Sequence, residues 1–109
     1  MSILGRTVTV TVDRPMGSRH PHFPDTRYPV NYGYIEGIMG GDGEPQDAYI
    51  LGLSSPADRF EGVVIAIIHR LDDNEDKWVV APEGYVTTQE KIREALSFQE
   101  QYFSSEIRM

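Results

Sequence analysis

The longest apolar run in the chain covers residues 63–68 and consists only of Val, Ile and Ala. β-Branched residues favour strands, and the run is far shorter than the roughly 18 apolar residues expected of a membrane-spanning helix. A polar, Asp-rich segment follows at 71–76, and a second β-rich run covers 77–81. An acidic link between two such runs is a turn signal, so we expect an antiparallel hairpin.

The remaining segments predict more short strands and one helix. Thr and Val alternate over residues 7–12, which indicates a half-buried strand, and further strands are expected around 32–35 and over 47–53. Thr87 precedes Glu90 by three residues, the spacing of a capping box. Apolar side chains then recur at helical intervals, at Ile92, Leu96, Tyr102, Phe103 and Ile107.

Length and composition limit the possible fold classes and the possible functions. A chain of 109 residues has room for one core, so we expect a single domain over 1–109, a mainly β (α+β) barrel of five to six strands with one C-terminal amphipathic helix. The formal charge of -7 argues against nonspecific binding to nucleic acid or an anionic membrane. The absence of cysteine excludes disulfides and thiolate chemistry. No secretory leader is evident, so a cytoplasmic location is expected.

Carboxylates gather at two places. The first cluster stands at the start of a predicted strand and contains Asp42, Glu44 and Asp47. The second stands in the predicted hairpin turn and contains Asp72, Asp73, Glu75 and Asp76. Each cluster alone is compatible with a solvated turn. Brought together by neighbouring strands, they would supply the oxygen ligands that Mg²⁺ or Mn²⁺ prefers, in the arrangement used for phosphoryl hydrolysis.

Arginine is the predominant cation, because eight of the ten basic residues are Arg. A planar guanidinium suits bidentate phosphate binding. Three arginines stand in the N-terminal loop region, Arg14, Arg19 and Arg27. Each is also compatible with an ordinary surface position, and Arg27, next to Tyr28 and Pro29, is the strongest candidate for a phosphate contact.

Two segments carry a family resemblance. Residues 28–35 read Tyr-Pro-Val-Asn-Tyr-Gly-Tyr-Ile, and residues 42–47 read Asp-Gly-Glu-Pro-Gln-Asp. In order and spacing they resemble the signature of the soluble, family I inorganic pyrophosphatases, Tyr-Pro-x-Asn-Tyr-Gly-Tyr-Ile followed by Asp-Gly-Asp-Pro-x-Asp. The resemblance implies an oligonucleotide-binding-like (OB-like) barrel. It also implies Mg²⁺-dependent hydrolysis of pyrophosphate or another small phosphoanhydride, in a chain that can form homo-oligomers.

The resemblance also implies roles for individual residues. The metal ligands would be Asp42, Asp47, Asp72 and Asp76, with Glu75 an equal candidate for the place of Asp76. Asp47 would bridge two ions, and Glu44 stands where the family has its general-base Asp. Tyr32, the third residue of the catalytic set, would hydrogen-bond phosphate or a ligand carboxylate. Phosphate would be contacted by Arg19, Arg27, Lys77 and Tyr102.

The chain departs from the family pattern at three places. Glu44 replaces an Asp, Pro21 and His22 stand where a Lys-Tyr-Glu run is expected, and Phe103 stands in place of a Lys. These departures motivate an alternative, a pyrophosphatase-like module that binds metal and phosphate or nucleotide without turnover. The charge and the lack of a basic stripe disfavour a nucleic-acid-binding barrel.

Overall fold

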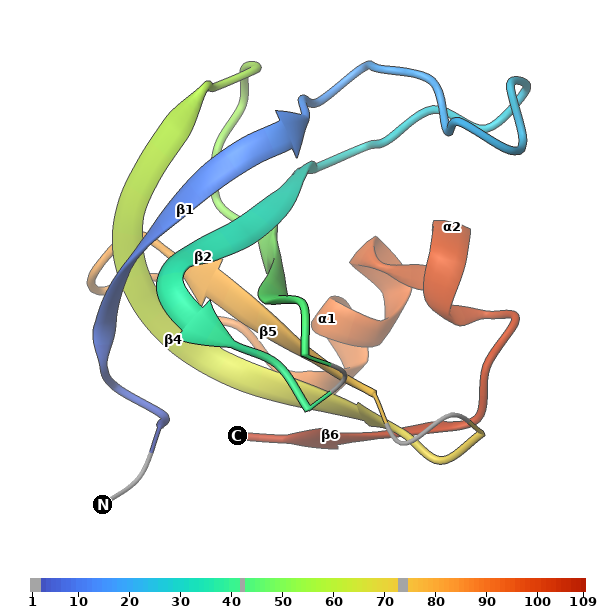
Figure 1. The fold of residues 1–109 in the computed structure, drawn as a ribbon. Helices are drawn as coiled ribbons and strands as arrows, with labels where there is room; N and C mark the ends of the chain where they lie inside the picture. Colours follow the sequence, from blue (N-terminus) through green and yellow to red (C-terminus); the bar gives the residue numbers. More distant parts are fainter. Residues whose placement is uncertain (1–2, 42, 73–74) are drawn as a thin grey trace.

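A computed structural model of the chain describes residues 3–41, 43–72 and 75–109. Its elements, in chain order, are β1 (Thr7–Arg14), β2 (Asn31–Met39), β3 (Pro45–Ile50), β4 (Arg59–Arg70), β5 (Asp76–Ala81), α1 (Gln89–Ala95), α2 (Ser97–Glu100) and β6 (Ser105–Arg108). Figure 1 shows a strongly curled sheet with both helices on one side of it. The mainly β class is therefore confirmed. Within the described residues, no helix has the length and apolar character needed to cross a membrane.

The sheet closes into a five-stranded barrel. Its strands run in the order β1-β2-β3-β5-β4, and β1 pairs again with β4 to complete the circle. Neighbours are antiparallel except β3 and β5, which run parallel with Ala48 opposite Trp78. The antiparallel pairing of β4 with β5 confirms the expected hairpin. Strand β6 pairs with residues 67–70 of β4 and lies outside the closed barrel.

Strand alternation produces two apolar clusters, one on each face of the sheet. The cluster inside the barrel draws on five strands and contains Val8, Val10, Ile35, Ala48, Ile50, Val64, Trp78 and Val80. The second lies between the outer face and the helices and contains Val30, Tyr49, Leu51, Ala66, Ile68, Val79, Ala81, Ile92, Leu96 and Ile107. Successive residues of β3 and β5 therefore face opposite clusters. The same alternation determines whether a polar side chain on these strands points into the barrel or toward the helices.

The C-terminal segment differs from the single helix expected. The N-cap is Thr88, whose hydroxyl accepts from the Lys91 amide, and α1 ends before Leu96. A second short helix follows, and Ile107 belongs to β6 rather than to a helix. Strand β1 pairs only with the first part of β4, so the backbone groups on that edge of residues 67–70 need another partner. Strand β6 supplies it, whereas a helix continuing to Ile107 would leave these groups of β4 unpaired.

Two residues of the segment 28–35 have structural roles on either side of Tyr32. The buried Asn31 amide accepts from the backbone N–H groups of Met16 and Ala57, at 2.9 and 3.1 Å, and so fixes two loops to the start of β2. A Cβ at Gly33 would lie 1.9 Å from the carbonyl oxygen of Thr11. Only glycine therefore allows β1 to approach β2 this closely.

Candidate active site

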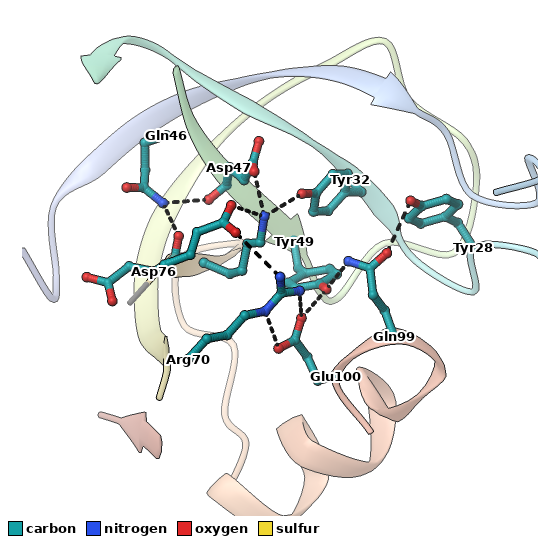
Figure 2. A network of polar contacts seen from close by, with 11 residues as sticks. Tyr28, Tyr32, Gln46, Asp47, Tyr49, Arg70, Asp76, Gln99 and Glu100 are labelled. Atoms are coloured by element: carbon teal, nitrogen blue, oxygen red, sulfur yellow. Dashed lines mark hydrogen bonds and ion pairs between the residues drawn. The ribbon is translucent and has the colours of Figure 1, made fainter. Parts of the chain in front are cut away.

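The ammonium of Lys77 lies at the centre of a polar cluster on the outer face of the barrel. It donates to Asp47 Oδ2 and Glu75 Oε1, both at 2.6 Å, and to the Tyr32 hydroxyl at 3.1 Å. The parallel register of β3 and β5 places Asp47 beside Lys77, and Figure 2 shows Asp47 and Tyr32 converging from neighbouring strands. Only 5% of the Lys77 side chain is exposed, so its charge depends on these partners.

The environment fixes the protonation states of Lys77 and Tyr32. Burial acts to lower the pKa of Lys77, but Tyr32, Asp47 and Glu75 outweigh it, so this pKa stands above its ordinary value and the amine is charged. Burial raises the pKa of Tyr32, against the opposing effect of Lys77. Tyr32 is therefore a neutral phenol at physiological pH.

A second polar network connects the barrel to α2. The Arg70 guanidinium forms a two-pronged ion pair with Glu100, with Nε–Oε1 and Nη2–Oε2 distances of 3.0 and 2.6 Å. Tyr49 donates to the same carboxylate at 2.6 Å, and Gln99 donates to the Tyr49 hydroxyl at 2.6 Å (Figure 2). Arg70 also approaches Glu75 at 3.5 Å. Glu75 thus joins the two networks, because it is paired with both Lys77 and Arg70.

A cleft of about 650 Å³ opens beside these networks. One wall is the loop between β1 and β2, which arches over the side of the barrel where α2 lies (Figure 1). The other wall comes from α2 and the residues after it. Three cations line the cleft, Arg14, Arg70 and Lys77. The buried Nε of Arg14 has no hydrogen-bond partner among the residues that the structure describes.

The predicted acids separate into two groups. Asp47 and Glu75 meet at Lys77, whereas Asp76 shares the opposite face of β5 with Trp78 and pairs with His69 at 2.6 Å. Alternation along the strand is the cause, because Glu75 and Lys77 are two residues apart. The structure therefore places Glu75, rather than Asp76, beside Asp47.

The other acids lie further from this point or are not described. The Asp72 carboxylate accepts from the Ser104 backbone N–H at 3.0 Å. Glu44 is exposed in the turn before β3, and Asp42 and Asp73 lie outside the described residues. Over residues 3–41, 43–72 and 75–109, no group of three potential metal ligands converges.

The predicted phosphate contacts also fall into two groups. Lys77 and Tyr102 line the cleft, and Tyr102 is 71% exposed. Arg19 and Arg27 are exposed and form an isolated β-bridge with each other; neither is among the lining residues, and Arg27 donates to the Gly17 carbonyl.

The sequence pattern does not single out Arg70, and it gives Arg14 no preference over Arg19 and Arg27. A signal for Arg70 was present: Glu100 follows Leu96 by four residues, which places a carboxylate on the buried side of the predicted helix. A buried carboxylate needs a cation partner, and Arg70 supplies it.

Comparison with known proteins decides the family. A family model described as inorganic pyrophosphatase matches residues 6–105, nearly the whole chain. The chain belongs to the inorganic pyrophosphatase family. Among curated relatives, inorganic pyrophosphatases of Streptomyces coelicolor and Corynebacterium glutamicum are 34% and 32% identical over 71 and 74 residues. These matches cover 51% and 54% of this chain but only 42% and 45% of the relatives, so the chain spans less than half of their length.

Solved structures agree on the fold. An inorganic pyrophosphatase from Neisseria gonorrhoeae matches with a TM-score of 0.66 at 21% identity, covering 93% of this chain and 76% of that one. One from Coxiella burnetii matches with a TM-score of 0.67 at 18% identity, covering 99% and 88%. At these identities the likeness shows a shared fold, the OB-like barrel of the pyrophosphatases.

The donor set suits the metal that this family commonly uses. Mg²⁺ is often held by one or two carboxylates, with water and substrate phosphate completing its shell. Asp47 and Glu75 direct two carboxylates to one point, and the Lys77 ammonium lies between them. In the structure the Lys77 ammonium occupies this point, so Asp47 and Glu75 would hold a divalent ion there only with that ammonium displaced.

Proposed function

We propose that this pyrophosphatase-family chain hydrolyses inorganic pyrophosphate to two phosphates with Mg²⁺, or with Mn²⁺ in its place. The observation that carries the proposal is the meeting of Lys77, Asp47, Glu75 and Tyr32 at the edge of a cation-lined cleft. An acidic protein can hold a tetra-anion only where local cations offset its charge, and this cleft is such a place.

Each residue has a role in this proposal. Asp47 and Glu75 hold the metal, with Asp42 and Asp72 as further candidate ligands from the two acidic clusters. A bound divalent ion neutralises phosphate charge and lowers the pKa of the attacking water. Lys77 and Tyr32 donate to phosphate oxygens, and the guanidinium of Arg14, which also lines the cleft, binds the far end of the anion. Tyr102, which lines the cleft, contributes a further hydroxyl to the phosphate.

The bond changes are those of a hydrolysis. The oxygen of a water molecule attacks one phosphorus, and the bond from that phosphorus to the bridging oxygen breaks. Glu44 takes the proton released by the water, and the second phosphate leaves with the bridging oxygen. Arg19 and Arg27, which lie outside the lining of the cleft, would act on substrate entering past the β1–β2 loop. A cytoplasmic location and a homo-oligomeric state complete the proposal.

The test is phosphate release from pyrophosphate with Mg²⁺ or Mn²⁺, for the natural chain and for Asp47→Asn. We expect metal-dependent turnover in the first and its loss in the second, because Asp47 would lose its charge as a ligand. Asp58→Asn changes an exposed Asp outside the cleft and is the matched control. Turnover that is absent, or that survives in Asp47→Asn, would count against the proposal.

A second candidate function is a module that binds metal and phosphate or nucleotide without turnover. It is favoured by the replacement of an Asp by Glu44 and by the exposed position of Glu44 in the turn before β3. A misplaced base lowers the rate of proton transfer while leaving affinity intact. Calorimetry separates the two functions: metal-dependent pyrophosphate binding without phosphate release supports the module.

A further inference from the structure

We propose that the cleft takes a nucleoside diphosphate, with its diphosphate at Lys77 and its base against the aromatic wall of the cleft. The inference rests on the proposed function, because a nucleoside diphosphate is a pyrophosphate with one terminal oxygen esterified. The diphosphate would therefore lie where pyrophosphate lies, and the esterified end would extend along the cleft.

The wall beyond the cations is aromatic. It is built from His20 and Phe23 of the β1–β2 loop, from Tyr28, and from Phe98 and Tyr102 on the opposite side. The rings of His20 and Tyr28 are nearly parallel, at 2° and 5.8 Å, and Phe23 lies 5.1 Å from His20. Planar faces of this kind stack on nucleobases of any sequence, since every base has a π-face.

Exposure indicates that part of this wall is free to accept a ring. The Phe23 side chain is 62% exposed and that of Tyr102 is 71% exposed, although both border the cleft. Aromatic side chains this accessible expose apolar surface to water, which is unfavourable unless a ligand or partner covers it. The two rings come from opposite walls of the cleft, so both are accessible to a planar group that enters it.

Volume and charge both favour a substrate larger and less charged than pyrophosphate. The cleft of about 650 Å³ falls in the range of sites that enclose drug-sized ligands, whereas pyrophosphate would leave most of it empty. Of the three lining cations, Arg70 is paired with Glu100 and Lys77 with two carboxylates. Esterification removes one negative charge, so a nucleoside diphosphate requires less positive charge from the cleft than pyrophosphate does.

The reaction follows the same bond changes as pyrophosphate hydrolysis. Water attacks the β-phosphorus, the bond from this phosphorus to the bridging oxygen breaks, and the nucleoside monophosphate leaves with that oxygen. The products are orthophosphate and a nucleoside monophosphate, with one proton released. No oxidant, reductant or further reactant is required.

The experiment compares ADP with pyrophosphate in the natural chain, Phe23→Ala and Phe23→Tyr. We expect a lower KM for ADP than for pyrophosphate. Loss of one stacking ring should raise the KM for ADP by about tenfold and leave the KM for pyrophosphate unchanged. Phe23→Tyr keeps the ring and should behave like the natural chain. Val86→Ala removes apolar surface at a side chain 89% exposed outside the cleft and is the control.

The outcomes separate this inference from the proposed function. If pyrophosphate is hydrolysed but ADP is neither bound nor hydrolysed, the inference is wrong and the proposed function stands. If neither is hydrolysed, the proposed function fails, and calorimetry with α,β-methylene-ADP decides the inference alone. Binding that weakens in Phe23→Ala and persists in Phe23→Tyr supports it, and undetectable binding to the natural chain overturns it.

Discussion

The Lys77 ammonium lies 2.6 Å from the Asp47 carboxylate across two parallel strands, with the Glu75 carboxylate at the same distance on its other side. A monovalent cation thus separates two carboxylates that would otherwise face each other. These carboxylates are 33% and 28% exposed, so water reduces but does not remove their repulsion.

Replacing this lysine should destabilise the fold in a way that metal restores. Lys77→Met leaves Asp47 without this cation and leaves Glu75 with only its longer contact to Arg70. We expect a loss of about 1 to 3 kcal/mol in the free energy of unfolding, below the cost for a fully buried pair. Mg²⁺ should then raise the melting temperature of the variant more than that of the natural chain. Thermal unfolding with and without Mg²⁺ measures both effects. Lys91→Met, at an exposed position on α1, is the control and should behave like the natural chain.

The choice between Glu75 and Asp76 as metal ligand gives a second prediction. Only Glu75 shares a face of the barrel with Asp47, while Asp76 is paired with His69. Glu75→Gln should raise the Mg²⁺ concentration needed for half-maximal activity by about tenfold or more, and Asp76→Asn should change it little. Mg²⁺ titrations of phosphate release compare the two. Equal effects, or a larger effect at Asp76, would contradict the assignment.

Much of the fold could be predicted from local pattern. The period-two runs and the Asp-rich turn predicted the barrel strands and the hairpin of β4 with β5, because burial on one face imposes alternation. The parallel contact of β3 with β5 could not be predicted, since adjacency of distant strands is a property of the closed sheet. The helical spacing that included Ile107 was misleading, because a strand delivers this side chain to the same apolar cluster as Ile92.

The candidate site also contains some residues that the sequence could predict and others that it could not. The family resemblance predicted roles for Asp47 and Lys77, and the structure places these two side chains in contact. Glu75 and Asp76 remained equal candidates because adjacent residues of a strand face opposite sides, and only the register shows which side meets Asp47. Arg14 and Arg70 reach the cleft from the ends of two strands far apart in sequence. No local pattern encodes that convergence.

The buried ion pair of Arg70 and Glu100 should be costly to break. Both side chains are at most 7% exposed, so Glu100→Gln leaves a buried guanidinium short of one negative partner. We expect a loss of about 2 to 4 kcal/mol in the free energy of unfolding, measured by urea denaturation. Replacing both partners, as in Arg70→Met with Glu100→Leu, should cost less than Glu100→Gln alone. Glu106→Gln breaks the exposed pair with Arg108 and should change stability by less than about 0.5 kcal/mol.

The length of the Glu44 side chain gives a prediction for catalysis. If Glu44 takes the proton from the attacking water, its additional methylene displaces the base, and small displacements are costly in rate. Glu44→Asp should therefore raise kcat by about tenfold or more with little change in KM. Steady-state kinetics on pyrophosphate test this, with Glu83→Asp, at an exposed turn position, as the control. A kcat that falls or stays constant would remove Glu44 from the role of base.

The buried Tyr49 hydroxyl predicts the behaviour of the protein at high pH. Burial, together with the adjacent Glu100 carboxylate, raises the pKa of Tyr49 well above its ordinary value of 10.0. The unfolded chain therefore releases this proton at lower pH than the folded chain, so stability is complete below pH 10 and decreases as the pH rises further. The slope attributable to one such group is at most about 1.4 kcal/mol per pH unit. Tyr49→Phe should show a shallower decrease in melting temperature above pH 10 than the natural chain, and Tyr85→Phe, at an exposed side chain, should not. Parallel curves for the natural chain and Tyr49→Phe would show that alkaline unfolding depends on other groups.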